Sequence, residues 1–150
     1  MDIKQAFTGE SNCILNTATL DQVTQSFLEH DVTDLFIVDE EDRLVGMVSE
    51  GDLIRYCMAD YRSLQQQGLD AEETFEVLAK KGESIVGQSV MKIAITNPVF
   101  VTVDTPVHKA AGFMLSKNIR KLPVLEGDKL VGTVSRARIA SLLLSGPKSE

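Results

Sequence analysis

The sequence predicts an α/β fold built from two copies of one helix-strand-strand-helix unit. The segment Leu44–Ser49 (LVGMVS) returns as Leu130–Ser135 (LVGTVS), which indicates that one structural unit has been duplicated. Upstream of each copy lies an apolar stripe with helical spacing, followed by a short apolar run typical of a strand. We therefore expect two similar modules, and we look for functional residues in the cleft between them.

The duplication can be followed residue by residue. Val32 corresponds to Ile119, and the same shift of 87 residues aligns the preceding helical stripes. The shift falls to 86 after the turn, because Asp39–Arg43 is one residue longer than Glu126–Lys129. A length change confined to a turn is what a surface connection tolerates.

Each unit is expected to begin with an amphipathic helix. Its apolar positions recur every three or four residues: Leu20, Val23, Phe27 and Leu28 in the first unit, and Val107, Ala110, Ala111, Met114 and Leu115 in the second. Thr19 and Gln22 predict a capping box, and Thr105 before Pro106 predicts a hydroxyl N-cap with proline at the first helical position.

Two short strands and a second helix follow in each unit. We expect the strands at 35–38 and 44–48, and at 122–125 and 130–134. Pro123 cannot donate to a strand ladder, so its strand should begin there or lie at an edge. Ser49 and Ser135 are expected to open the second helices.

A helical hairpin is predicted between the units. The second helix of the first unit should continue to Gln66, with an apolar face of Ile54, Cys57, Met58, Tyr61 and Leu64. After Gly68, a further helix should carry Ala71, Phe75, Leu78 and Ala79 on one face and close at Gly82. This hairpin either covers the apolar outside of the first unit or binds a partner or a second copy. We expect three regions: repeat 1 at 1–66, the insertion at 67–87 and repeat 2 at 88–150.

Composition and charge limit the classes of function. The 150 residues are 43% hydrophobic and 25% charged, which suffices for a buried core. The net charge is −7, with 12 acidic and 2 basic residues in 1–54 but 4 acidic and 9 basic in 88–150. The acidic total argues against nonspecific nucleic-acid binding. The basic half either forms a local anion site or attracts the acidic half, within the chain or in a dimer.

Neither a membrane nor a metal partner is indicated. No apolar run approaches bilayer length, and the start of the chain lacks an export signal, so we expect a cytoplasmic protein. Cys13 and Cys57 lack metal-ligand spacing and fit isolated thiols in a reducing compartment. His30 and His108 have no partner at acid–base or metal spacing, and no nucleophile elbow or phosphate loop occurs. We therefore expect a protein that is not an enzyme.

The duplicated pattern resembles a tandem pair of cystathionine-β-synthase (CBS) domains, known as a Bateman module. The resemblance covers almost the whole chain apart from 55–87. It implies two α/β repeats related by a pseudo-twofold axis, with clefts that hold adenosine-containing ligands. It also implies a homodimer and a regulatory role toward another protein.

The family's ligand signature is Gly, two residues, Ser or Thr, two residues, Asp. It is intact from Gly46 through Ser49 to Asp52, whereas the second copy has Arg138 in the aspartate's place. A carboxylate can accept hydrogen bonds from both ribose hydroxyls, and a serine at a helix start can meet phosphate. Spacing alone favours an N-cap with an acid in the first helical turn, and the surrounding repeat favours the ligand role. The two roles are compatible.

The resemblance also suggests where the rest of a ligand would lie. The phosphates would meet basic residues of the second repeat, at Arg120, Lys121 and Arg136, where the first repeat has Thr33, Asp34 and Glu50. This asymmetry predicts one adenine-nucleotide site rather than two. The adenine would lie against Met47 and the segment 89–94, with contacts from Ser89, Met91 and Ile93. That segment departs from the family pattern, because four extra residues separate Met91-Lys92 from Asn97-Pro98.

Three functions follow from these observations. The favoured one is a regulatory module that requires no cofactor, senses an adenosine nucleotide (AMP, ADP or ATP, or a relative such as NAD or S-adenosylmethionine) and signals to a regulated protein. The second is a structural or dimerisation module whose clefts stay empty. The third, a small enzyme or nucleic-acid binder, has little support in the sequence.

Overall fold

The computed structural model describes residues 1–9 and 12–146. These residues form two three-stranded sheets, ordered β1-β2-β3 and β4-β5-β6. The chain divides into two compact units, each assembled from separate stretches. Within the described residues, unit 1 takes in 1–9, 38–45 and 97–146, and unit 2 takes in 12–37 and 46–96.

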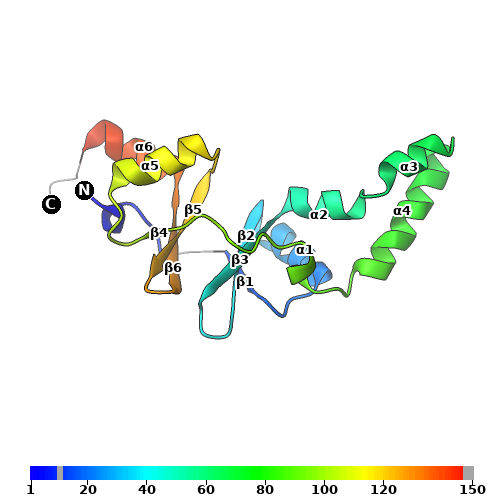
Figure 1. Ribbon diagram of the computed structural model, residues 1–150, viewed down its shortest axis with the longest axis horizontal. Helices are drawn as coiled ribbons and strands as arrows, with labels where there is room; N and C mark the ends of the chain where they lie inside the picture. The colour runs from blue at the N-terminus through cyan, green and yellow to red at the C-terminus, as the bar shows by residue number, and fades with distance from the viewer. Residues whose placement is uncertain (10–11, 147–150) are drawn as a thin grey trace. The chain divides into compact units, whose positions relative to one another are not determined.

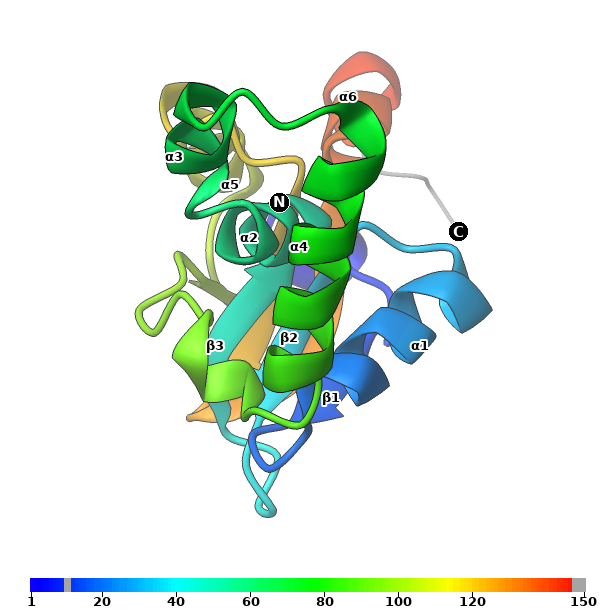
Figure 2. The ribbon, with the colours of Figure 1, turned by 90° about the vertical axis from the view of Figure 1, so that its right-hand side faces the viewer.

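Unit 2 contains the first sheet and most of the helices. Its elements are β1 (Cys13–Leu15), α1 (Leu20–His30), β2 (Asp34–Val38), β3 (Leu44–Ser49), α2 (Glu50–Cys57), α3 (Tyr61–Gln66) and α4 (Ala71–Ile85), with the ends of β2 and β3 that face the hairpin turn counted in unit 1. Helices α1 and α2 cover one face of the sheet, whereas α3 and the N-terminal end of α4 extend away from it (Figure 1, Figure 2). Burial of apolar side chains stabilises the packing of unit 2. The most buried of them, at most 1% exposed, are Val23, Leu35, Ile37, Val48 and Val90.

Unit 1 contains the second sheet and two helices. Its elements are β4 (Val101–Thr102), α5 (Val107–Ser116), β5 (Lys121–Glu126), β6 (Lys129–Ser135) and α6 (Arg136–Ser145). Strand β4 pairs parallel to β5, and β5 pairs antiparallel to β6. Residues from the start of the chain complete its core, in which Ile3 and Ala6 pack with Val107, Met114 and Leu122.

A short lead-in segment from one repeat packs against the body of the other repeat in each unit. In unit 1, the turn Ile3–Gln5 is held by the Ile3 amide donating to the Thr105 carbonyl at 2.9 Å. In unit 2, the turn Val90–Lys92 is held by the Val90 amide donating to the Ala18 carbonyl at 2.8 Å. These bonds are equivalent under the shift of 87 residues, so the internal repeat extends upstream to the first turn of the chain. The division into 1–66, 67–87 and 88–150 follows the repeat rather than this packing and stays a prediction.

The predicted strands, the first helices and the Thr19–Gln22 capping box are confirmed, with boundaries moved by a residue or two. The expected N-cap at Thr105 is wrong. Helix α5 begins at Val107 with Pro106 as its N-cap in an extended conformation. The Thr105 hydroxyl instead accepts a hydrogen bond from the Thr102 amide at 2.9 Å and closes the preceding turn.

The placement of Pro123 at the start or edge of a strand is also wrong. Strand β5 begins at Lys121 and is the central strand of its sheet, with Pro123 opposite Thr133 of β6. Strand β4 pairs only with Val124 and Leu125, so the ladder on that side stops short of Pro123. The missing amide donor is therefore tolerated inside a central strand.

The helical hairpin differs from the prediction in two respects. The stretch from Ser49 to Gln66 is two helices, because α2 ends at Cys57 and a turn precedes α3. Helix α4 does not close at Gly82, since the Gly82 carbonyl accepts the Val86 amide at 3.0 Å and the helix continues to Ile85. The short strands β1 and β4, which are three and two residues long and have no alternating pattern of their own, were not predicted from the sequence.

Candidate functional site

The start of α2 holds the most constrained polar pair of the predicted site. The Asp52 carboxylate accepts hydrogen bonds from the Ser49 amide and the Ser49 hydroxyl, both at 2.9 Å. The Ser49 hydroxyl in turn accepts the Asp52 amide at 3.1 Å, which completes a capping box. The side chain of Asp52 is only 12% exposed. The capping role that the spacing allowed is therefore present.

Arg55 is a neighbour of this pair that the sequence analysis missed. Its guanidinium donates to the second carboxylate oxygen of Asp52 at 2.6 Å, and its side chain is 73% exposed. The signal was available in the sequence, because an acid and a base three residues apart on a helix lie on the same face. The Asp52 carboxylate is thus held by its own helix on both oxygens.

The backbone of β3 next to this helix is extended by the lead-in segment of the second repeat. Met47 and Ile95 exchange backbone hydrogen bonds of 3.0 and 2.9 Å. Gly46 permits the approach, because a Cβ at this position would lie 2.9 Å from the Ile95 carbonyl oxygen. A side chain at position 46 would therefore push the segment away from Met47.

The rest of the segment is fixed at its other end. The Tyr56 hydroxyl of α2 donates to the Gln88 side chain at 2.6 Å, and Ser89 caps the following turn by accepting the Met91 amide at 3.1 Å. Met91 is 36% exposed, and Ile93 is half-buried. Six of the predicted residues therefore belong to unit 2: Met47, Ser49, Asp52, Ser89, Met91 and Ile93.

The three predicted cations lie in unit 1. Arg120 is exposed, and Lys121 begins β5 opposite Ser135. Neither has an ion pair within the described part of the chain. The Arg120 carbonyl accepts the Arg136 amide at 3.1 Å, which brings Arg120 and Arg136 together at the start of α6.

Arg136 has a structural role that the sequence analysis did not anticipate. Its guanidinium donates to the carbonyl oxygens of Ile119 and Met114, at 2.8 and 3.0 Å, and to the Asn118 side chain at 3.1 Å. These acceptors follow or end α5, where carbonyl groups lack partners within the helix. Arg136 therefore fastens the C-terminal end of α5.

The second copy of the signature lacks the reciprocal bonds of the first. The Ser135 hydroxyl accepts the Arg138 amide at 3.2 Å and caps α6, as Ser49 caps α2. The Arg138 guanidinium has no acceptor atom, so it cannot accept a hydrogen bond from the Ser135 amide. The two copies share one half of the capping box and differ in the half that needs a carboxylate.

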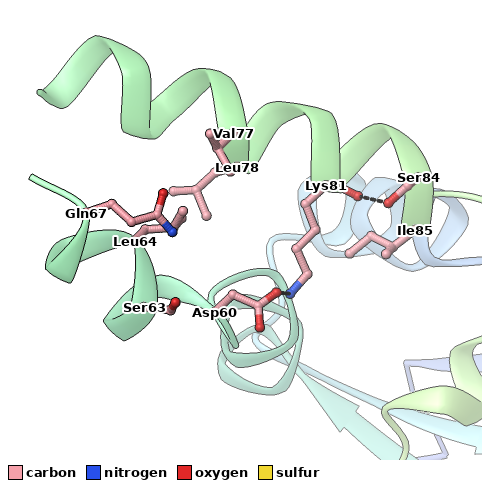
Figure 3. Close-up of a pocket in the computed structure, with 9 residues that line it drawn as sticks. All are labelled: Asp60, Ser63, Leu64, Gln67, Val77, Leu78, Lys81, Ser84 and Ile85. Atoms are coloured by element: carbon pink, nitrogen blue, oxygen red, sulfur yellow. Dashed lines mark hydrogen bonds and ion pairs between the residues drawn. The ribbon is translucent and has the colours of Figure 1, made fainter. Parts of the chain in front are cut away.

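A separate cavity of about 380 Å³ lies between α3 and α4, away from the predicted residues (Figure 3). Its apolar lining includes Leu64 and Leu78, and the Lys81 ammonium pairs with Asp60 at 3.2 Å at its rim. The ion pair leaves no unpaired charge aimed into the cavity that would select a ligand.

Both cysteines are free thiols; Cys13 is exposed and Cys57 half-buried. Across residues 1–9 and 12–146, no three His, Cys, Asp or Glu side chains gather in a way that could hold a metal ion. None of the helices in this described part combines the length and apolar character needed to cross a membrane.

Sequence comparison identifies the family. The profile of the CBS domain matches twice, at residues 11–59 and 90–145. The chain belongs to the CBS domain family. Among curated relatives, it is 27% identical over 139 residues to the chloroplastic CBS domain-containing protein CBSX1 of Arabidopsis thaliana, covering 89% of this chain. The chain spans 59% of the length of CBSX1 and 56% of that of its relative CBSX2.

Solved structures confirm the fold. The structure of CBSX2 in complex with AMP aligns with a TM-score of 0.70 and 22% identity, covering 95% of this chain and 96% of that one. The CBS domain pair of protein MJ0100, solved with 5′-methylthioadenosine and S-adenosyl-L-methionine, aligns with a TM-score of 0.64 and 20% identity, covering 95% and 99%. The resemblance to a tandem CBS pair and the predicted α/β class are both confirmed.

Proposed function

We propose that this chain is a regulatory module that binds an adenosine nucleotide through Asp52 and the surrounding residues of unit 2. The observation that carries the proposal is the intact Gly46-Ser49-Asp52 signature, with the Asp52 carboxylate held at the start of α2 beside the Met47–Ile95 pairing. CBSX2 and protein MJ0100, which share the fold, are solved with adenosine-containing molecules, and this supports the choice of ligand class.

The hydrogen-bonding capacity of Asp52 fits a ribose. An ionised carboxylate offers about four acceptor positions, and Ser49 and Arg55 occupy three of them. The Arg55 side chain is mostly exposed, so its bond can be exchanged for a ribose hydroxyl at little cost. Ser49 then keeps the carboxylate oriented while the ligand replaces Arg55.

The finer points of the sequence analysis remain predictions. They are the identity of the nucleotide among AMP, ADP, ATP, NAD and S-adenosylmethionine, phosphate contacts from Arg120, Lys121 and Arg136, a homodimer, a regulated partner protein and a cytoplasmic location. The competing function is a structural module that binds no ligand. It predicts that replacing Asp52 changes no ligand response.

Thermal shift and calorimetry with adenosine, AMP, ADP, ATP, NAD and S-adenosylmethionine test the proposal. A ligand at ~100 times its dissociation constant stabilises the folded state by about 2.7 kcal/mol, which raises the midpoint by roughly 5–10 °C for a chain of this size. We expect at least one ligand to produce this shift in the wild type and none in Asp52→Ala.

A matched control separates ligand contact from helix capping. Glu73 occupies the same third position in the capping box of α4, where its side chain accepts the Asp70 amide at 3.3 Å. Glu73→Ala should lower the midpoint of the free protein as Asp52→Ala does, yet keep the ligand response. An equal loss of response in both variants, or no response to any ligand in the wild type, contradicts the proposal.

A further inference from the structure

Helix α4 presents an apolar stripe that is only partly covered. Phe75, Ala79 and Gly82 recur at helical spacing along one face, and the C-cap residue Val86 continues the same line; we call these four residues the α4 stripe. Phe75 is 71% exposed and Val86 is 45% exposed. The stripe runs about 16 Å, or three helical turns. Exposed apolar residues that are contiguous on a surface indicate a contact site, whereas isolated ones do not. Phe75 is in line with further apolar residues and so meets this condition.

The C-terminal end of the stripe opens into a groove. A hollow of about 260 Å³ lies between α1, α2 and the C-terminal end of α4. It is lined by Leu20, Asp21, Thr24, Leu53, Cys57, Gly82, Ile85 and Val86. The lining is apolar apart from Asp21 and Thr24. Gly82 and Val86 belong to both the groove and the stripe, so the two features form one continuous surface.

Helix α3 covers a different side of α4. The residues of α4 that face α3 include Val77, Leu78 and Lys81, which line the cavity between the two helices (Figure 3). At 100° per residue, Phe75 and Ala79 point away from that side. The hairpin thus packs through one side of α4, and α3 does not cover Phe75 or Ala79.

A row of carboxylates borders the stripe. Glu72, Glu76 and Glu83 lie about 60–100° around the helix from Phe75, all on the same edge, and all three are exposed. None of them forms an ion pair within the described part of the chain. Unit 2 as a whole has 12 acidic and 5 basic residues, so it carries the entire net charge of −7.

We propose that the α4 stripe and its groove bind a basic amphipathic helix of a partner protein. The apolar face of such a helix would cover Phe75 and Val86, and its Lys or Arg side chains would meet Glu72, Glu76 and Glu83. A stripe of three turns matches the contact length of a short helix laid alongside α4.

The same charges disfavour a second copy of this chain as the occupant. In an antiparallel pair of α4 helices related by a twofold axis, the acidic edge of one helix faces the acidic edge of the other. Three glutamates on each side would then repel. A basic partner neutralises them instead.

Fluorescence anisotropy with synthetic peptides tests this proposal on the full chain. The probe is a labelled peptide of about 16 residues with Leu and Phe on one helical face and Lys elsewhere, compared with a scrambled peptide of identical composition. We expect the amphipathic peptide to bind at least ~10-fold more tightly than the scrambled one. We expect Phe75→Ser to weaken its binding at least ~10-fold, because the largest apolar side chain of the stripe is removed.

Two matched controls define the surface. Leu115→Ser removes another exposed apolar side chain, 79% exposed on α5, and should leave binding unchanged. The second control concerns charge. The test variant carries Glu72→Gln, Glu76→Gln and Glu83→Gln, and the control variant, with the same net charge, carries Glu29→Gln, Glu40→Gln and Glu126→Gln. The test variant should bind the peptide more weakly than the control variant, and its affinity should depend less on salt concentration. Equal binding of the scrambled peptide, or no effect of Phe75→Ser, overturns the proposal. Dissociation of a dimer by Phe75→Ser without peptide binding also overturns it and assigns the stripe to a second copy.

Discussion

The Asp52 carboxylate accepts hydrogen bonds from both the amide and the hydroxyl of Ser49, each at 2.9 Å. The same two residues form the helix cap and the family's ligand signature. A carboxylate fixed in this way needs no rearrangement to receive a ribose, apart from the release of Arg55 from its second oxygen. The cap therefore pre-organises the group that is proposed to bind the sugar.

Replacement of Arg55 tests this competition. In Arg55→Ala, the second oxygen of Asp52 is free, so we expect adenosine or AMP to bind roughly 2–5-fold more tightly than to the wild type, in line with the value of ~0.5–1 kcal/mol for an exposed ion pair. Isothermal titration calorimetry measures the change. Arg62→Ala, which removes an arginine of α3, serves as the control. A tenfold loss of affinity in Arg55→Ala would instead make Arg55 a ligand contact.

The predicted phosphate contacts can be separated from the nucleoside contacts. We expect Arg120→Ala and Lys121→Ala to weaken AMP binding by roughly 5–20-fold, about 1–2 kcal/mol for each charge-assisted hydrogen bond removed, and to leave adenosine binding unchanged. The difference should shrink in high salt, because exposed charges are screened. Equal effects on AMP and adenosine would show that neither residue meets a phosphate.

Arg136 should matter for stability irrespective of any ligand. Arg136→Gln removes the bonds to Met114, Ile119 and Asn118, and we expect it to cost about 1–2 kcal/mol, or a fall in midpoint of roughly 2–8 °C. Arg138→Gln is the matched control, since its side chain has no bond to α5 within the described residues. Thermal unfolding of the free protein checks the difference, and an unchanged midpoint for Arg136→Gln would contradict the structural role.

The two signature glycines should respond unequally to alanine. At Gly132, a Cβ would collide with the Thr8 carbonyl oxygen and would lie 2.7 Å from the Phe7 ring, whereas at Gly46 the nearest contact is the Ile95 carbonyl oxygen at 2.9 Å. We expect Gly132→Ala to destabilise by about 2–3 kcal/mol and Gly46→Ala by about 1 kcal/mol. Chemical denaturation measures both. A larger effect at Gly46 would contradict the expected order.

The hairpin turn between β2 and β3 should depend on pH through Asp39. Burial opposes ionisation of this carboxyl, but bonds from the Arg43 and Glu41 amides and the Arg43 guanidinium outweigh it, so the pKa of Asp39 is held below its ordinary value of 3.8. The stabilisation is therefore complete above pH 3.8 and is lost as the pH falls through the lower pKa of the folded state. Asp39→Asn should lower the midpoint at pH 7 and have a smaller effect near pH 2. A difference from wild type that stays constant between these pH values would exclude this linkage.

The local signals in the sequence predicted most of the fold. The LVG-x-VS repeat, the stripes beginning at Leu20 and Val107, and the serines at 49 and 135 correctly indicated strands, helices and their starts, because each depends on neighbours in the chain. Pro123 was placed wrongly because its tolerance depends on where β4 ends, which is a property of another strand.

The predicted site shows the same division. The pairing of Ser49 with Asp52 could be read from their spacing, since both lie in one helical turn. The bonds of Arg136 could not, because its acceptors come from the end of another helix, 17 to 22 residues earlier in the chain. The exposure of Phe75 was likewise hidden, because spacing predicts an apolar face but not what covers it.

The sequence by itself determined that this protein is a duplicated α/β module with one intact Gly-Ser-Asp signature, since periodicity and capping act within a few residues. Only the tertiary structure decided that the lead-in segments Ile3–Gln5 and Val90–Lys92 each pack on the body of the other repeat. It alone also decided that Arg136 fastens α5 and that the Phe75 side of α4 stays uncovered. These outcomes depend on long-range packing, in which segments far apart in the chain can bury the same apolar surface. A local sequence pattern does not specify which of these segments covers it.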